Sequence, residues 1–106
     1  MGVYNRFVTF SMKIPDKIKV GGNIIKIVRG AYYTGTEQHD GGWLDWEQNT
    51  MFLSNDMPKD REATCFMHEI LHAMNIYLKE EQVTYLSEML MQVITDNNLD
   101  FRTKNV

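Results

Sequence analysis

The stretch His68-Glu69-Ile70-Leu71-His72 decides how the chain folds around it and what it can bind. On an α-helix, residues four apart lie on the same face, so His68 and His72 would project side by side. Two imidazole nitrogens at this spacing can bind one zinc ion. Glu69 lies about 100° around the helix. From there its carboxylate can take a proton from a metal-activated water instead of binding the metal.

The residues around this motif have the periodicity of a helix. Ser54, Asn55 and Asp56 are candidate N-caps, and Pro58 suits a first helical turn. Apolar side chains then recur every three to four residues, which predicts a helix over 58–78. They are Ala63, Phe66, Met67, Ile70, Leu71, Met74 and Tyr77. Cys65 precedes His68 by three residues, and we interpret it as a buried structural thiol rather than a metal ligand.

Two pairs of short strands are expected before this helix. Residues 17–20 and 24–28 flank a Gly-Gly-Asn turn, which predicts a β-hairpin. Residues 43–46 and 50–53 flank a second turn. In zinc-helix proteases the strand just before the helix often borders the cleft, so we expect 50–53 to be able to pair with an extended peptide. Trp43 and Trp46 are interpreted as core or edge packing rather than as a substrate platform.

A second helix, running from about residue 80 to about 97, supplies the candidates for the third metal ligand. With Val83 set at zero and about 100° per residue, the apolar positions centre at about −30°. They are Val83, Leu86, Leu90, Val93 and Ile94. Glu80 falls at about +60°, on the rim of this face, and Glu81 falls at about +160°. Glu80 is therefore the preferred third ligand, and Glu81 stays as the alternative.

The remaining segments are glycine-rich or terminal. Residues 30–42 form a predicted loop that holds His39 and Tyr33. A solvated loop histidine and a packed tyrosine are the ordinary interpretations; the sharper one is that either side chain stabilises the oxyanion of a reacting carbonyl. Residues 1–13 are expected to form either a short strand or a loose arm, and residues 99–106 a frayed tail.

Bulk composition limits the class of protein. A chain of 106 residues is expected to form a single α+β domain, with short antiparallel strands packed on two main helices. The net charge of −3 and the absence of a basic cluster give no support for nucleic-acid binding. With one cysteine, no apolar run long enough for a membrane span and no signal-peptide pattern, we expect a cytoplasmic protein without a membrane partner.

The chain resembles the small phage- and prophage-encoded members of the ImmA/IrrE-like zinc metallopeptidases, a gluzincin-type group. The likeness rests on the Gly-Gly hairpin at 18–22, the strand around 51–53, the motif over 68–73 and the acidic opening of the last helix at 80–83. This resemblance implies a zincin-like fold, one catalytic zinc and hydrolysis of a peptide bond. It also implies Glu80 as the third ligand, with Val83 as the small apolar residue that follows. Some relatives cleave repressor proteins, which implies a phage or host regulator as substrate.

Two hypotheses of different classes follow. In the first, zinc held by His68, His72 and Glu80 serves an endopeptidase with Glu69 as general base. In the second, the metal only stabilises a small chain, which binds and modulates a host or phage partner without cutting it. An open fourth coordination position favours the enzyme, whereas a fourth protein ligand such as Cys65 or His39 favours the structural site.

Overall fold

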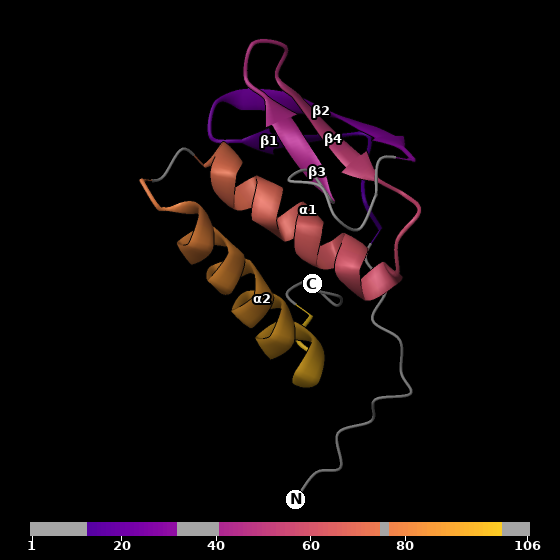
Figure 1. Cartoon of the computed structure of the whole chain (residues 1–106), viewed down its shortest axis with the longest axis vertical. Coiled ribbons are helices and arrows are strands. Elements are labelled where there is room, and N and C mark those ends of the chain that lie inside the picture. Colours follow the sequence, from indigo (N-terminus) through magenta and orange to yellow (C-terminus); the bar gives the residue numbers. More distant parts are fainter. Residues whose placement is uncertain (1–12, 32–40, 75–76, 101–106) are drawn as a thin grey trace, which may run out of the picture.

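The computed structural model describes residues 13–31, 41–74 and 77–100. Within them the chain forms a four-stranded sheet and two helices, so the predicted α+β class is confirmed (Figure 1). His39 and Tyr33 lie outside the described residues, as do residues 1–12 of the expected arm and 101–106 of the expected tail. Among the described residues, no helix has the length and apolar character needed to cross a membrane.

The predicted hairpin is confirmed. Strand β1 (Lys17–Val20) pairs antiparallel with β2 (Asn23–Gly30). Gly21 in the turn has a φ of +60°, a conformation that glycine adopts without steric penalty. Alternate residues of β2 point to the core, and Ile25 and Ile27 are buried there.

The strands after the loop join the hairpin in a way that the sequence pattern did not show. Strands β3 (Gly42–Asp45) and β4 (Thr50–Ser54) pair antiparallel, and β4 also pairs parallel with β2. The sheet order is therefore β1-β2-β4-β3. The expectation that 50–53 pairs with a peptide is wrong, because both sides of β4 are already occupied. Among the described strands, the outer edge nearest to β4 belongs to β3.

The register shows which backbone groups of β3 face this outer edge. The Ser54 N–H donates to the Gly41 carbonyl at 2.9 Å, and Trp43 lies opposite Phe52. Hydrogen-bonded pairs alternate along an antiparallel ladder, so the N–H and C=O groups of Gly42 and Leu44 point away from β4. Since no described strand pairs with this side of β3, these groups can act as donors and acceptors for a further strand.

Helix α1 (Lys59–Ala73) packs across one face of the sheet, and α2 (Glu80–Asp96) lies against the far side of α1 (Figure 1). The core between α1 and the sheet is apolar, with Met51 and Leu53 of β4 fully buried. The other buried members of this core are Ile25, Ile27, Met57, Phe66 and Ala73. The helix that carries the histidine motif is thus held in place by the sheet.

Helix α1 is shorter than the pattern over 58–78 predicts. Its N-cap is Pro58, with no side-chain cap hydrogen bond, and its C-cap is Met74. Ser54 does not cap the helix, because its hydroxyl bonds the Asp56 carboxylate. Tyr77, which the pattern placed on the apolar face, is 98% exposed. The early end follows from the packing of α2, since the chain has to reverse direction to bring α2 alongside α1.

Helix α2 begins where the sequence predicted, but it turns a different face to its neighbour. The buried residues are Val83, Ser87 and Met91, at about 0°, 40° and 80° on the same wheel. Leu86 and Leu90, expected to be buried, are 36% and 41% exposed. The small Ser87 side chain, 1% exposed, lies at about +40°, outside the apolar face that the wheel had centred at about −30°.

Candidate metal centre

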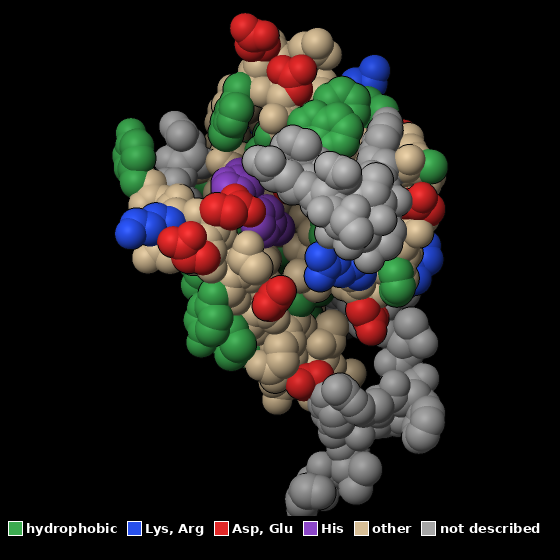
Figure 2. Space-filling model, in the orientation of Figure 1, with side chains coloured by type: hydrophobic (Ala, Val, Ile, Leu, Met, Phe, Trp, Pro, Cys, Tyr) green, Lys and Arg blue, Asp and Glu red, His purple; other side chains and the backbone are tan. Residues whose placement is uncertain are grey.

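Three side chains converge where the last turn of α1 meets the first turn of α2. The Nε2 atoms of His68 and His72 lie 3.1 Å apart. The two oxygens of Glu80 reach one nitrogen each, with Oε2 at 3.0 Å from His68 and Oε1 at 2.9 Å from His72. Figure 2 shows the two histidines at the surface with acidic side chains beside them. These three residues are the group that the sequence predicted as the metal ligands.

Local structure explains the convergence. The four-residue spacing places His68 and His72 one turn apart on α1, with their ring centroids 4.8 Å apart. Glu80 is the first residue of α2, and the connection after Met74 brings it back to the histidines. Glu81, the alternative ligand, is exposed and does not belong to this group of converging donors.

The donor set fits a zinc ion. Imidazole nitrogens and carboxylate oxygens bind zinc at about 2.0–2.2 Å, which places tetrahedral ligand atoms roughly 3.3 Å apart. The observed spacings of 2.9–3.1 Å are close to this value. Among the described residues, His68, His72 and Glu80 form the one group of three or more such donors. Three protein ligands leave a fourth position for water or substrate, as catalytic zinc sites do.

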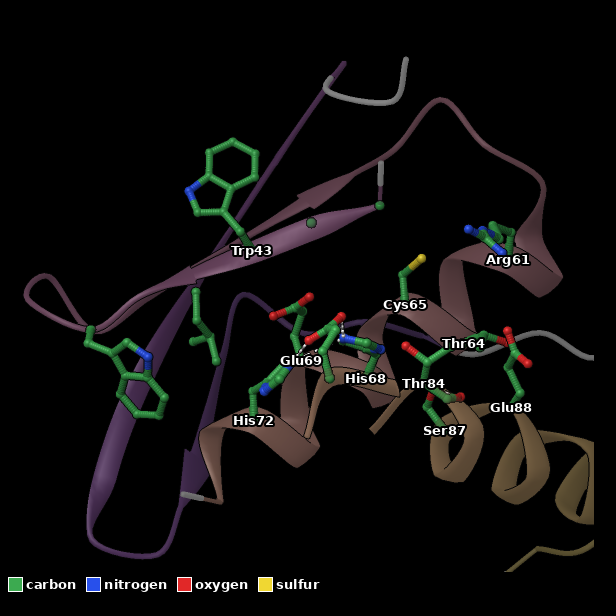
Figure 3. Close-up of a pocket in the computed structure, with 15 residues that line it drawn as sticks. Trp43, Arg61, Thr64, Cys65, His68, Glu69, His72, Thr84, Ser87 and Glu88 are labelled. Atoms are coloured by element: carbon green, nitrogen blue, oxygen red, sulfur yellow. Dashed lines mark hydrogen bonds and ion pairs between the residues drawn. The ribbon is translucent and has the colours of Figure 1, made fainter. Parts of the chain in front are cut away.

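Glu69 lies beside the three donors but is not one of them. Its side chain is buried, at 7% exposure, and it lines the same groove as the histidines (Figure 3). Burial, with a further contribution from the Glu80 charge, raises the pKa of Glu69 to about 7. A carboxyl group with this pKa can both accept and return a proton near neutral pH.

Burial favours the neutral form of the His68 imidazole. Burial lowers its pKa, against the opposing effect of the neighbouring Glu80 carboxylate. A lower pKa favours the neutral imidazole, whose free ring nitrogen is the metal ligand.

The candidate site lies in a groove of about 640 Å³ between α1, α2 and β3. Side chains from three successive turns of α1 line it, from Arg61 to His72, a length of about 16 Å. The other lining residues on α1 are Thr64, Cys65, His68 and Glu69. Helix α2 contributes Glu80, Thr84, Ser87 and Glu88, and the opposite wall is formed by Gly41, Gly42, Trp43, Leu44 and Trp46.

Close packing at one end of the groove depends on a glycine. A Cβ atom on Gly41 would lie 2.1 Å from the Cys65 sulfur, so any larger residue would push β3 away from α1. Cys65 itself is half-buried and lines the groove, but it is not one of the converging donors. The prediction that it is not a ligand agrees with this placement.

The groove also contains a residue whose role sequence reasoning missed. Trp46 was interpreted as packing, yet it is 52% exposed and lines the groove. The sequence carries no local signal for this exposure, because it depends on β3 being an edge strand. Trp43 does pack, because its ring stacks on Phe52 with centroids 4.7 Å apart.

Comparisons of the chain with protein-family models, with curated proteins and with solved structures find no significant match.

Proposed function

We propose that this chain is a zinc-dependent endopeptidase that hydrolyses a peptide bond in a protein substrate. The observation that carries the proposal is the convergence of His68, His72 and Glu80 beside a buried glutamate, Glu69, which is not a ligand. A structural metal site needs the three donors, but it has no use for a buried carboxyl group beside them. Hydrolysis needs both.

The roles of the residues follow from their positions. When bound, a zinc ion acidifies water and polarises a carbonyl group. Glu69 takes one proton of the attacking water as the oxygen bonds to the carbonyl carbon of the substrate. The same carboxyl group then gives this proton to the amide nitrogen as the C–N bond breaks, so that a carboxylic acid and an amine leave, and the acid then loses its proton to solvent. Its buried position beside the three donors places Glu69 where it can make both transfers.

The groove favours a stretch of polypeptide as the substrate. Its length of about 16 Å matches roughly five residues of extended chain. The outward N–H and C=O groups of Gly42 and Leu44 offer the hydrogen bonds that a peptide needs to join the sheet as a further strand. The family resemblance extends the proposal to a regulatory protein of phage or host as the substrate.

Replacement of Glu69 by glutamine tests the proposal. The variant removes the proton acceptor and keeps the size of the side chain, so zinc binding should stay near wild type and peptide cleavage should fall by about a hundredfold or more. Cleavage of a proteome-derived peptide library by zinc-loaded protein, with metal content measured in parallel, checks both expectations. Glu81→Gln is the matched control, because it changes an exposed acid outside the site.

Equal cleavage by wild type and Glu69→Gln would rule out this mechanism. If zinc binds and no peptide is cut by the wild type, the zinc-stabilised binding protein is the better description of the chain.

A further inference from the structure

One large apolar side chain stands unburied in the groove. The described residues include ten exposed large hydrophobic side chains, and only Trp46 among them lines the groove. The indole of Trp43, three residues earlier, is used in the stack on Phe52 and points away from His68 and His72 (Figure 3). A half-exposed tryptophan in a binding groove is a favourable contact for an apolar group of a ligand.

The turn that carries Trp46 is well ordered. The Asp45 carboxylate accepts hydrogen bonds from the N–H groups of Glu47 and Gln48, at 3.1 and 3.2 Å. The Thr50 hydroxyl donates to the Gln48 carbonyl at 2.9 Å, and Asn49 closes the turn with a φ of +48°. These bonds hold the backbone on either side of Trp46, so a ligand that covers its side chain does not have to order the turn.

The position of Trp46 along the groove follows from the directions of the elements. Gly41, just before β3, lies against Cys65 in the middle of α1. From there both segments run the same way, β3 toward Asp45 and α1 toward His72 (Figure 3). Trp46 therefore follows the end of β3 on the His72 side of the groove. At the opposite end of the groove, α1 contributes the charged side chain of Arg61.

We propose that Trp46 selects an aromatic or large aliphatic side chain on the N-terminal side of the scissile bond. A peptide that adds to β3 in the antiparallel direction, the more stable pairing, places its N-terminal part beside the residue after Asp45. This inference rests on the proposed peptidase function and names the chemical class of its substrate: an extended segment with a large apolar residue within about three positions before the cut.

A cleavage profile tests this selection. A proteome-derived peptide library is digested by zinc-loaded wild type, Trp46→Ala, Trp46→Phe and the control Tyr85→Ala, which removes an exposed aromatic ring outside the groove. The wild type should enrich large apolar residues before the cut, and Trp46→Ala should lower this preference about tenfold, as expected for losing part of a buried apolar contact. Trp46→Phe should retain most of it, and Tyr85→Ala should leave it unchanged.

A binding measurement separates recognition from turnover. The best-cleaved peptide and its alanine-substituted counterpart are titrated into zinc-loaded Glu69→Gln, with and without Trp46→Ala. The Kd ratio of the two peptides should fall about tenfold when Trp46 is removed. An unchanged ratio, or a preference located after the cut, would overturn the inference and leave the peptidase standing. Absence of any cleavage by the wild type would overturn both.

Discussion

The two helices contribute to one candidate site from very different surroundings. Helix α1 packs against β3 and β4 on one side and against α2 on the other, so its histidines project from a helix that is held on both sides. Helix α2 packs substantially only against α1 among the described elements. Its outer surface carries exposed apolar side chains, namely Tyr85, Leu86, Met89, Leu90 and Val93. The comparison indicates that the histidine pair is preformed, and that Glu80 joins it from a less supported element.

Charged contacts add to this difference. Arg29 of β2 forms an ion pair with Glu62, which is 4% exposed in the first turn of α1. This pair ties the start of α1 to the sheet. At the start of α2, Glu80 contacts His68 and His72 of α1 rather than the sheet, and the Lys79 N–H donates to the Gln82 side chain at 2.8 Å. Stability should therefore respond far more strongly to changes in α1 than to changes on the outer surface of α2.

Removal of the Phe66 ring is the strongest way to break the α1 packing. Phe66 is 5% exposed in the core between α1 and the sheet. Phe66→Ala should lower the free energy of unfolding by about 3–5 kcal/mol, because it loses buried apolar contact and leaves a cavity. Urea unfolding of the metal-free protein measures it. A loss below about 1 kcal/mol would mean that α1 is not held by the sheet as described.

Glu69 lies on the side of α1 that lines the groove, and its burial there can be tested by the pH dependence of stability. In the metal-free protein its pKa of about 7, against 4.5 for an ordinary glutamate, means that the folded state binds the proton more tightly than the unfolded state. Its contribution to stability therefore falls as pH rises from about 4.5 to 7. Glu69→Gln removes this effect, so the variant should gain on wild type by up to about 3 kcal/mol by pH 8.

Unfolding curves of both metal-free proteins between pH 4.5 and 8 check this expectation. A difference between wild type and Glu69→Gln that does not grow with pH would show that the Glu69 carboxyl is not destabilised in its ionised form.

Leu90 on α2 should show the smallest effect. It is 41% exposed on the outer surface of the helix. Leu90→Ala should change the free energy of unfolding by about 0.5 kcal/mol or less, as surface substitutions do. When both variants are measured together, the difference between their stability losses compares the packing of α1 with that of the outer surface of α2. A loss of about 2 kcal/mol or more would place Leu90 in a buried contact and contradict the described face of α2.

The parts of the structure that depend on local pattern were predictable from the sequence. The Gly-Gly turn specified the hairpin, and the four-residue spacing placed His68 and His72 together. Glu80 does lie beside the two histidines, as the prediction of a third ligand required, although the reason given for selecting it was partly wrong. The wheel put it on the rim of the expected apolar face, whereas the observed buried face is rotated toward Ser87. This rotation places Glu80 almost in the middle of the side toward α1.

The parts that depend on distant neighbours were not predictable in this way. Apolar periodicity does not predict that a serine, Ser87, is buried on α2. A close contact between two helices favours a small side chain over a larger apolar one. The parallel pairing of β2 with β4 joins segments that are far apart in the sequence and carries no local signal. The exposure of Trp46 follows from the same topology, because that pairing makes β3 an edge strand.

Zinc affinity of untagged protein, measured for wild type, His72→Ala, Glu80→Ala and the control Glu81→Ala, tests the central claim most directly. Wild type and Glu81→Ala should bind about one zinc per chain with equal affinity. His72→Ala should weaken binding by at least about a hundredfold, and Glu80→Ala by less, because its side chain is 68% exposed and water can replace the carboxylate. Unchanged zinc affinity in His72→Ala and Glu80→Ala, or a folded wild type that binds no zinc, would contradict the account.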